Sequence, residues 1–104
     1  MAWEESMHIK VELHPDVAWF VRHRCTQREV DEFYRLLEAL RAEPIRHSEM
    51  VVEPRLRRYA LRLFRFGVNL AVFEYNAAKN RIRVLECRKA KPIIRRNGGD
   101  AGEP

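Results

Sequence analysis

The chain of 104 residues has room for one domain with one core, and its 46% hydrophobic and 34% charged residues are typical of a folded globular protein. No stretch reaches the roughly 18 uninterrupted apolar residues of a membrane span, and the acidic start over residues 1–5 (MAWEE) lacks the basic, then apolar, pattern of a secretion signal. The net charge of +5 is uneven, because residues 1–54 hold seven basic and eleven acidic residues while residues 55–96 hold thirteen and two. We therefore expect a cytoplasmic protein with no membrane contact, with one domain over residues 1–96 and a disordered tail over residues 97–104.

The first half of the chain predicts a strand and two helices. Residues 7–13 alternate apolar and polar side chains, which is the pattern of a half-buried strand. Pro15 is suited to the first turn of a helix that runs to about Arg24. Thr26 and Glu29 have the spacing of a capping box, so a second helix is expected to begin here. The two helices form a hairpin with an apolar inner stripe, and its aromatic residues are expected in the core: Trp19, Phe20, Phe33 and Tyr34.

The second half predicts a loop and a meander of three strands. Residues 45–54, between Pro44 and Pro54, show no sustained period, which indicates a loop with a short extended piece at residues 50–52. Strands joined by connections as short as those that follow form an antiparallel meander. The expected strands are residues 57–65, 68–75 and 81–88, with connections at 66–67 and 76–80.

The element order β-αα-βββ predicts an α+β fold, in which the N-terminal helical hairpin packs on one face of a mainly antiparallel sheet. The other face then stays open. The alternation of side chains gives one assignment of the faces, with Tyr59, Leu61, Leu63, Val68, Leu70 and Val72 against the helices. The open face then holds Arg58, Arg62, Asn69, Phe73 and Tyr75. On the last strand the assignment is ambiguous, because Ile82 and Val84 share parity with Glu86 and Arg88, and a bulge would reconcile it.

The basic second half of the chain predicts a surface for a polyanion, with RNA as the first candidate. Charge polarisation of this size gives one face a positive potential that raises the encounter rate with anionic partners. Sixteen of the twenty basic residues are arginine, and arginine binds phosphate through two parallel hydrogen bonds and stacks on bases. Three aromatic residues either stack bases on this surface or fill core space: Phe64, Phe73 and Tyr75. Cys25 and Cys87 lack metal-ligand spacing, so we expect no metal and no other cofactor.

Four segments together resemble the RelE/ParE family of bacterial toxins, over about residues 7–91. They are the end of the helical hairpin at 41–44 (RAEP), then 59–63 (YALRL), 67–76 (GVNLAVFEYN) and 82–88 (IRVLECR). The resemblance implies the toxin of a type II toxin–antitoxin system, with an antitoxin protein as partner and roles in stress response and plasmid stabilisation. Many members cleave messenger RNA in the ribosome, and the ParE branch instead poisons DNA gyrase. Whether the protein forms a homodimer is left open.

Site residues carried over from the family match this chain in part. Arg62 matches a basic position on the second strand of the meander, and Glu53 resembles the glutamate of a Glu-Pro pair that is a candidate general base in the YoeB-like branch. Asn69 stands where many members have an arginine, and no tyrosine or histidine follows Arg88 at the end of the last strand. The resemblance therefore implies Arg62, Arg88 and Glu53 as catalytic residues.

Cleavage of RNA at a 2′-hydroxyl group needs a proton acceptor and cations that stabilise charge on phosphorus. Arginine stays protonated and serves only as the cation, so the proton must go to Glu53, Glu86 or His47. Glu86 has an alternative role as the ion-pair partner of Arg62 or Arg88. Binding of the RNA backbone is assigned to the remaining basic residues: Arg58, Arg65, Arg81, Arg83, Lys89 and Lys91.

Three functions remain open from the sequence. The first is a RelE-like, ribosome-dependent mRNA endoribonuclease. The second is a catalytically degenerate RelE/ParE-fold protein that binds nucleic acid, gyrase or an antitoxin without ribonuclease activity, and the substitution at Asn69 favours it. The third is an α+β protein that binds an acidic protein partner.

Overall fold

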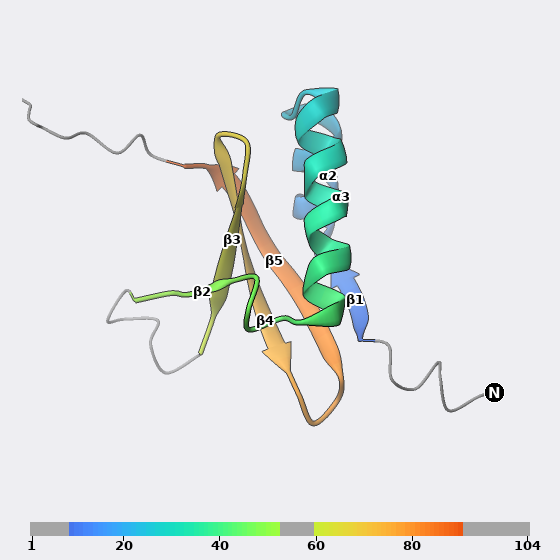
Figure 1. Cartoon of the computed structure of the whole chain (residues 1–104). Coiled ribbons are helices and arrows are strands. Elements are labelled where there is room, and N and C mark those ends of the chain that lie inside the picture. The colour runs from blue at the N-terminus through green and yellow to red at the C-terminus, as the bar shows by residue number, and fades with distance from the viewer. Residues whose placement is uncertain (1–8, 53–59, 91–104) are drawn as a thin grey trace, which may run out of the picture.

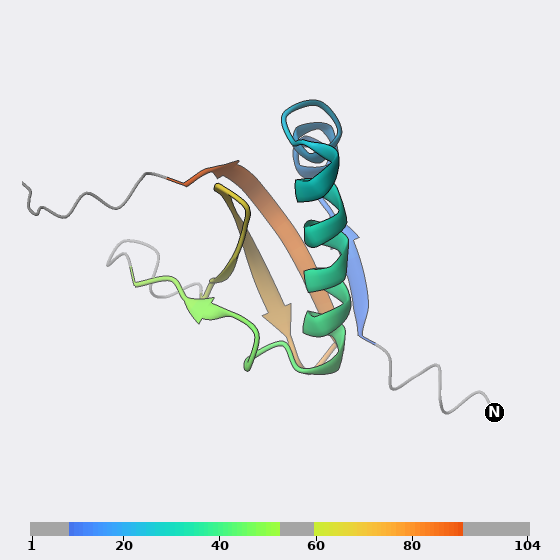
Figure 2. The ribbon, with the colours of Figure 1, turned by 45° about the horizontal axis from the view of Figure 1, so that its top comes forward.

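A computed structural model of the chain describes residues 9–52 and 60–90, which form one sheet covered on one face by two helices (Figures 1 and 2). The predicted α+β fold is confirmed. The predicted tail over residues 97–104 lies outside the described residues. In chain order the elements are β1 (Lys10–Leu13), α2 (Pro15–His23), α3 (Gln27–Ala42), β2 (Glu49–Met50), β3 (Arg62–Phe66), β4 (Asn69–Asn76) and β5 (Arg81–Lys89).

The sheet is mixed, with the strand order β1-β5-β4-β3-β2. The predicted meander is confirmed, because β3, β4 and β5 pair as antiparallel neighbours. β1 pairs in parallel with β5 at one edge of the sheet. Parallel strands need a long crossover between them, and the helical hairpin forms part of it. At the other edge β2 pairs with only the first two residues of β3.

The capping box predicted at the start of α3 is confirmed. The hydroxyl oxygen of Thr26 accepts a hydrogen bond from the backbone N–H of Glu29 at 3.2 Å, and the Glu29 carboxylate accepts one from the backbone N–H of Thr26 at 2.9 Å. Both N–H groups would otherwise lack a partner at the helix N-terminus. The hydrogen bond from Thr26 is the main reason that the pKa of Glu29 lies below its ordinary value.

Replacing Thr26 with alanine is expected to lower the free energy of unfolding by about 1 kcal/mol. For a domain of this size, that corresponds to a fall in Tm of about 4–8 °C. Thermal unfolding followed by circular dichroism measures the change. Thr26→Ser keeps the hydroxyl group and should retain most of the stability, and an equal loss in both variants would contradict the capping role.

Helix α3 also holds the turn between β3 and β4. The backbone N–H of Gly67 donates to the Glu32 carboxylate at 3.2 Å, and that of Val68 donates to Glu29 at 3.5 Å. Gly67 has a φ of +58°, and a Cβ atom here would lie 2.7 Å from the Glu29 side chain. The turn therefore requires glycine both for its conformation and for the close approach of α3.

The core lies between the sheet and the helices, and it reverses the predicted assignment of the two faces. Phe33 of α3 packs on Phe64 and Phe66 of β3, with ring centroids 5.8 and 5.0 Å apart. Phe73 of β4 lies beside Phe64 at 6.1 Å and is fully buried. The side chains that alternation assigned to the open face lie on the helix side: Arg62, Asn69, Phe73 and Tyr75. Those of Leu63, Leu70 and Val72 point away from the helices. The helix side thus takes the larger aromatic rings, which bury more area than the aliphatic side chains.

The bulge proposed for the last strand is confirmed. Val72 pairs with Glu86 and its neighbour Phe73 pairs with Val84, so Leu85 is an extra residue on β5. Before the bulge Val84 is fully buried against the helices. After it the alternation is reset, which turns Glu86 to the face opposite the helices.

Two of the four aromatic residues expected in the core lie at the surface instead. Phe33 is buried and Phe20 half-buried, but Trp19 is 54% exposed and Tyr34 is 50% exposed. The buried residues of α2 are Val17 and Val21, four positions apart. Trp19 lies midway between them in sequence and therefore points to another side of the helix.

Candidate nucleic-acid interface

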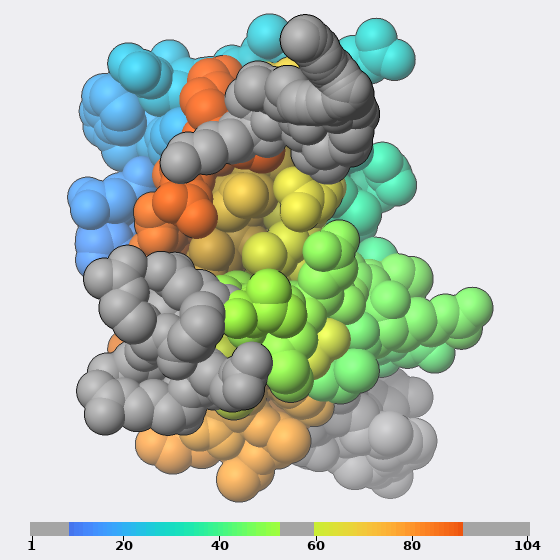
Figure 3. Space-filling view, turned by 90° about the vertical axis from the view of Figure 1, so that its left-hand side faces the viewer, coloured from blue at the N-terminus to red at the C-terminus, as the bar shows by residue number. Residues whose placement is uncertain are grey.

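The face of the sheet opposite α2 and α3, here called the open face, is defined by the strand register, because residues paired across neighbouring strands share a face. Arg65 of β3 pairs with Leu70 of β4, and Leu70 pairs with Arg88 of β5. Two arginines therefore flank one leucine, two strand spacings or about 10 Å apart. Figure 3 looks onto this face, with β3 and β4 in its middle and β5 to one side. The next row along the strands is Leu63, Val72 and Glu86.

The arginines of the open face are held only loosely. The Arg65 side chain is 51% exposed, and its Nε atom lies 3.6 Å from a Glu49 carboxylate oxygen. The Arg88 side chain is 62% exposed, with Nε 4.0 Å from Glu86. Exposed ion pairs of this kind contribute about 0–1 kcal/mol. Both guanidinium groups are therefore accessible to an incoming phosphate group.

A third arginine lies on the open face toward β1. Arg83 pairs with Glu74 on one side and with Glu12 on the other. Its Nε atom lies 3.5 Å from a Glu12 carboxylate oxygen, and its side chain is 49% exposed. Arg65, Arg83 and Arg88, which the sequence predicted as RNA-binding or catalytic residues, thus lie together on the open face.

The middle of the open face is aliphatic. Leu70 and Val72 are 9% and 8% exposed between the flanking charged side chains. The aromatic residues considered for base stacking lie on the other side, since Phe64 and Phe73 are buried core residues and Tyr75 packs against the core. Their alternative role as core residues is confirmed. On this part of the surface, the side chains able to stack on bases are the arginines, because their guanidinium groups are planar.

Arg62 does not lie on the open face, and that prediction is wrong. It shares parity with Phe64, which places it on the helix side at the edge of the sheet. Its Nε atom donates to the Ser48 hydroxyl at 2.6 Å, and one terminal nitrogen donates to the backbone oxygens of Ser48 at 3.2 Å and Ile45 at 3.3 Å. These contacts give Arg62 a structural role in holding the turn before β2. Its predicted catalytic role stays a prediction.

The other predicted residues are spread more widely. Lys89 faces the helix side, where its Nζ atom donates to the backbone oxygen of Arg24 at 3.3 Å. Arg81 lies at the far end of β5, and its buried Nε atom has no hydrogen-bond partner within residues 9–52 and 60–90. The structure therefore does not bring Lys89 together with the arginines of the open face. Three predicted residues lie outside the described residues: Glu53, Arg58 and Lys91.

The resemblance implied an arginine at position 69, and the residue present, Asn69, is fully buried on the helix side. Its side-chain nitrogen contacts the Cys25 sulfur at 3.8 Å, and its side-chain oxygen has no hydrogen-bond partner among the described residues. Asn69 therefore belongs to the helix–sheet interface. It lies on the opposite face of the sheet from Arg65 and Arg88.

No group of residues suited to a metal ion occurs within residues 9–52 and 60–90. The two cysteines are half-buried, and burial raises the pKa of Cys87 to about 12. A thiol with so high a pKa is a poor nucleophile and metal ligand. Among the described helices none is long and apolar enough to cross a membrane.

Sequence reasoning missed two features of this surface. Glu49 was not singled out, although the pairing of β2 with β3 brings it beside Arg65. Leu70 and Val72 were predicted to pack on the helices, and they are buried on the opposite face instead. The signal available was the apolar character of both parities in β4, which indicates a strand buried on both faces.

The five-stranded sheet, with a helical hairpin on one face, has a RelE-like fold. A chain of the RelBE2 toxin–antitoxin complex from Mycobacterium tuberculosis has this fold, with a TM-score of 0.65 and 13% sequence identity over 79% of this chain and 98% of that one. A chain of the archaeal RelE–RelB complex from Pyrococcus horikoshii gives a TM-score of 0.59 and 16% identity over 79% and 94%. No protein-family model and no curated protein matches the sequence.

Proposed function

We propose that the chain is the toxin of a type II toxin–antitoxin system and acts in the cytoplasm as a RelE-like, ribosome-dependent mRNA endoribonuclease. The observation that carries the proposal is the arginine pair on the open face of a sheet whose fold is shared with chains of two RelE–RelB complexes. An antitoxin is the protein partner, and messenger RNA held in the ribosome is the substrate.

In the proposed reaction the open face binds one phosphodiester of the RNA. Arg65 and Arg88 contact its oxygens from the two sides of Leu70 and stabilise the negative charge that grows on phosphorus. The 2′-oxygen bonds to phosphorus, the bond from phosphorus to the 5′-oxygen breaks, and a cyclic phosphate and a 5′-hydroxyl result. The proton from the 2′-hydroxyl goes to Glu86 on the open face, to Glu53 or to His47, and the leaving 5′-oxygen takes a proton from that same group or from water.

Induced expression of the chain without an antitoxin tests the proposal. We expect growth arrest, together with cuts in messenger RNA that require ribosomes when purified protein, ribosomes and transcript are combined. Primer extension on the transcript locates the cuts. Normal growth with intact transcripts would exclude the ribonuclease.

The second candidate is a protein with the same fold that binds nucleic acid without cutting it. The observation in its favour is that Glu49 and Glu86, the carboxylates beside the arginine pair, each form an ion pair with an arginine. Under this alternative RNA binds with a steep dependence on salt, in which log K falls by about 0.7 per neutralised phosphate of a single strand per decade of salt. The same ribosome assay would then give binding without cleavage.

A further inference from the structure

A groove of about 340 Å³ lies beside the open face, between α3, the turn before β2 and β3. Its walls carry Arg46 and His47 from the turn and Arg65 from β3, and its apolar lining includes Leu36 and Phe64. The volume is at the lower end of the range of small-molecule sites, which combine an apolar lining with a few polar groups. Arg65 belongs both to this groove and to the open face, so the two surfaces are continuous.

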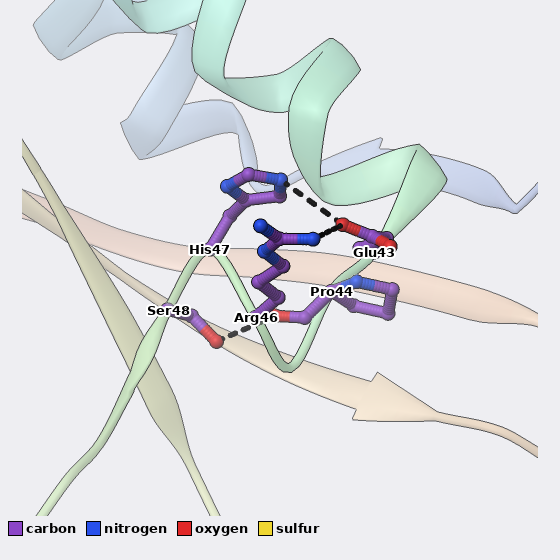
Figure 4. A network of polar contacts seen from close by, with 5 residues as sticks. All are labelled: Glu43, Pro44, Arg46, His47 and Ser48. Atoms are coloured by element: carbon purple, nitrogen blue, oxygen red, sulfur yellow. Dashed lines mark hydrogen bonds and ion pairs between the residues drawn. The ribbon is translucent and has the colours of Figure 1, made fainter.

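The turn that forms one wall is fixed by its own hydrogen bonds. Ser48 donates from its hydroxyl group to the backbone oxygen of Pro44 at 2.6 Å, and the same hydroxyl oxygen accepts the hydrogen bond from Arg62 at 2.6 Å. Figure 4 shows Ser48 turned back toward Pro44, whereas the side chains of Arg46 and His47 extend to the other side of the turn. Hydrogen bonds within the chain therefore hold the turn that carries Arg46 and His47.

The arginines of the groove form ion pairs with glutamates that a phosphate group can replace. Arg46 lies 3.3 Å and His47 3.6 Å from the same oxygen of Glu43, as Figure 4 shows. The Arg46 side chain is 75% exposed, and the ion pair of Arg65 with Glu49 is long, at 3.6 Å. Because such exposed pairs are weak, a phosphate oxygen that offers a shorter, charge-assisted hydrogen bond is expected to displace either carboxylate.

We propose that this groove is a second subsite for single-stranded RNA, which holds one nucleotide next to the phosphodiester bound on the open face. Arg46 and Arg65 bind its phosphate from opposite walls, and the apolar lining accommodates its base or ribose. The inference rests on the proposed function, because it extends the RNA path from the open face around the free edge of β3. It assigns Arg46, which sequence reasoning did not select, to RNA binding.

The chain offers a matched control for Arg46. Arg35 is also exposed, at 71%, and also pairs with a glutamate three positions earlier, Glu32, at 4.0 Å. It lies on α3 and does not line the groove. Arg46→Gln and Arg35→Gln therefore remove the same charge and the same type of ion pair, but only the first changes the groove.

The test measures fluorescence anisotropy of a labelled 2′-O-methyl oligouridylate of roughly 12 nucleotides, which cannot be cut at its 2′ positions. We expect Arg46→Gln to raise Kd about fivefold and to reduce the slope of log K against log salt by about 0.7, the contribution of one phosphate contact. Arg35→Gln should leave both unchanged. Equal effects of the two substitutions would overturn the subsite.

Two further arms separate the subsite from the proposed function. If Arg88→Gln weakens binding and Arg46→Gln does not, the open face binds RNA and the groove does not. If the wild-type protein cuts transcript held in the ribosome but does not bind the oligonucleotide, the subsite is overturned and the proposed function stands. A polyglutamate peptide of equal charge serves as the acidic-protein probe, and an equal loss of its binding in Arg46→Gln would also overturn the assignment to RNA.

Discussion

Replacing Arg65 and Arg88 together with glutamine is expected to abolish growth arrest on induction and ribosome-dependent cleavage of the transcript. Each guanidinium group is positioned for a charge-assisted hydrogen bond to phosphate, worth about 1.5–3 kcal/mol. Loss of both therefore lowers the rate by roughly a hundredfold to ten-thousandfold. The single variants should each retain partial activity, because the remaining arginine still contacts the phosphodiester from one side of Leu70.

A matched double variant, Arg22→Gln with Arg35→Gln, removes the same charge from the helices. It keeps the open face intact and should arrest growth as the wild-type protein does. Circular dichroism shows whether each variant is folded, and since both target arginines are more than half exposed, little change in Tm is expected. Full toxicity of a folded Arg65→Gln, Arg88→Gln variant would exclude the open face as the site.

The sequence predicted the elements of this fold well, because each has a local signal. The capping box at Thr26 located the start of α3, and Gly67 located the turn between β3 and β4. The parity conflict between Val84 and Arg88 indicated a bulge, which the register places at Leu85. Such signals depend on near neighbours in the chain and do not require knowledge of the tertiary structure.

The choice of which face packs on the helices had no such signal. In β3 the apolar residues Leu63 and Phe64 are adjacent and fall on opposite faces, and in β4 both parities are apolar. The choice is made by tertiary packing, because Phe33 of α3 provides a partner for the rings of Phe64 and Phe66. Because the two faces of the sheet were exchanged in the prediction, Arg62 lies on the helix side and Arg65 lies on the open face.

Replacing Arg62 with alanine is the substitution on which the two interpretations differ most. Three hydrogen bonds join its guanidinium group to Ser48 and Ile45, and the two acceptors left behind on Ser48 are partly buried. We expect the free energy of unfolding to fall by about 2–3 kcal/mol, with a fall in Tm of roughly 10–20 °C. Arg65→Ala, on the same strand with one loose ion pair, should change stability by no more than about 0.5 kcal/mol.

Activity measured below the Tm of the variant then separates the two roles of Arg62. If Arg62 only holds the turn before β2, the folded fraction of Arg62→Ala should cut RNA at close to the wild-type rate, with its loss of activity on warming parallel to unfolding. If Arg62 contacts the phosphodiester, the folded variant should be inactive at every temperature. Arg62→Lys adds a further distinction, because lysine keeps the charge but cannot reach both backbone oxygens in the planar geometry of the guanidinium group. Low stability together with normal activity in Arg62→Lys would therefore support the structural role.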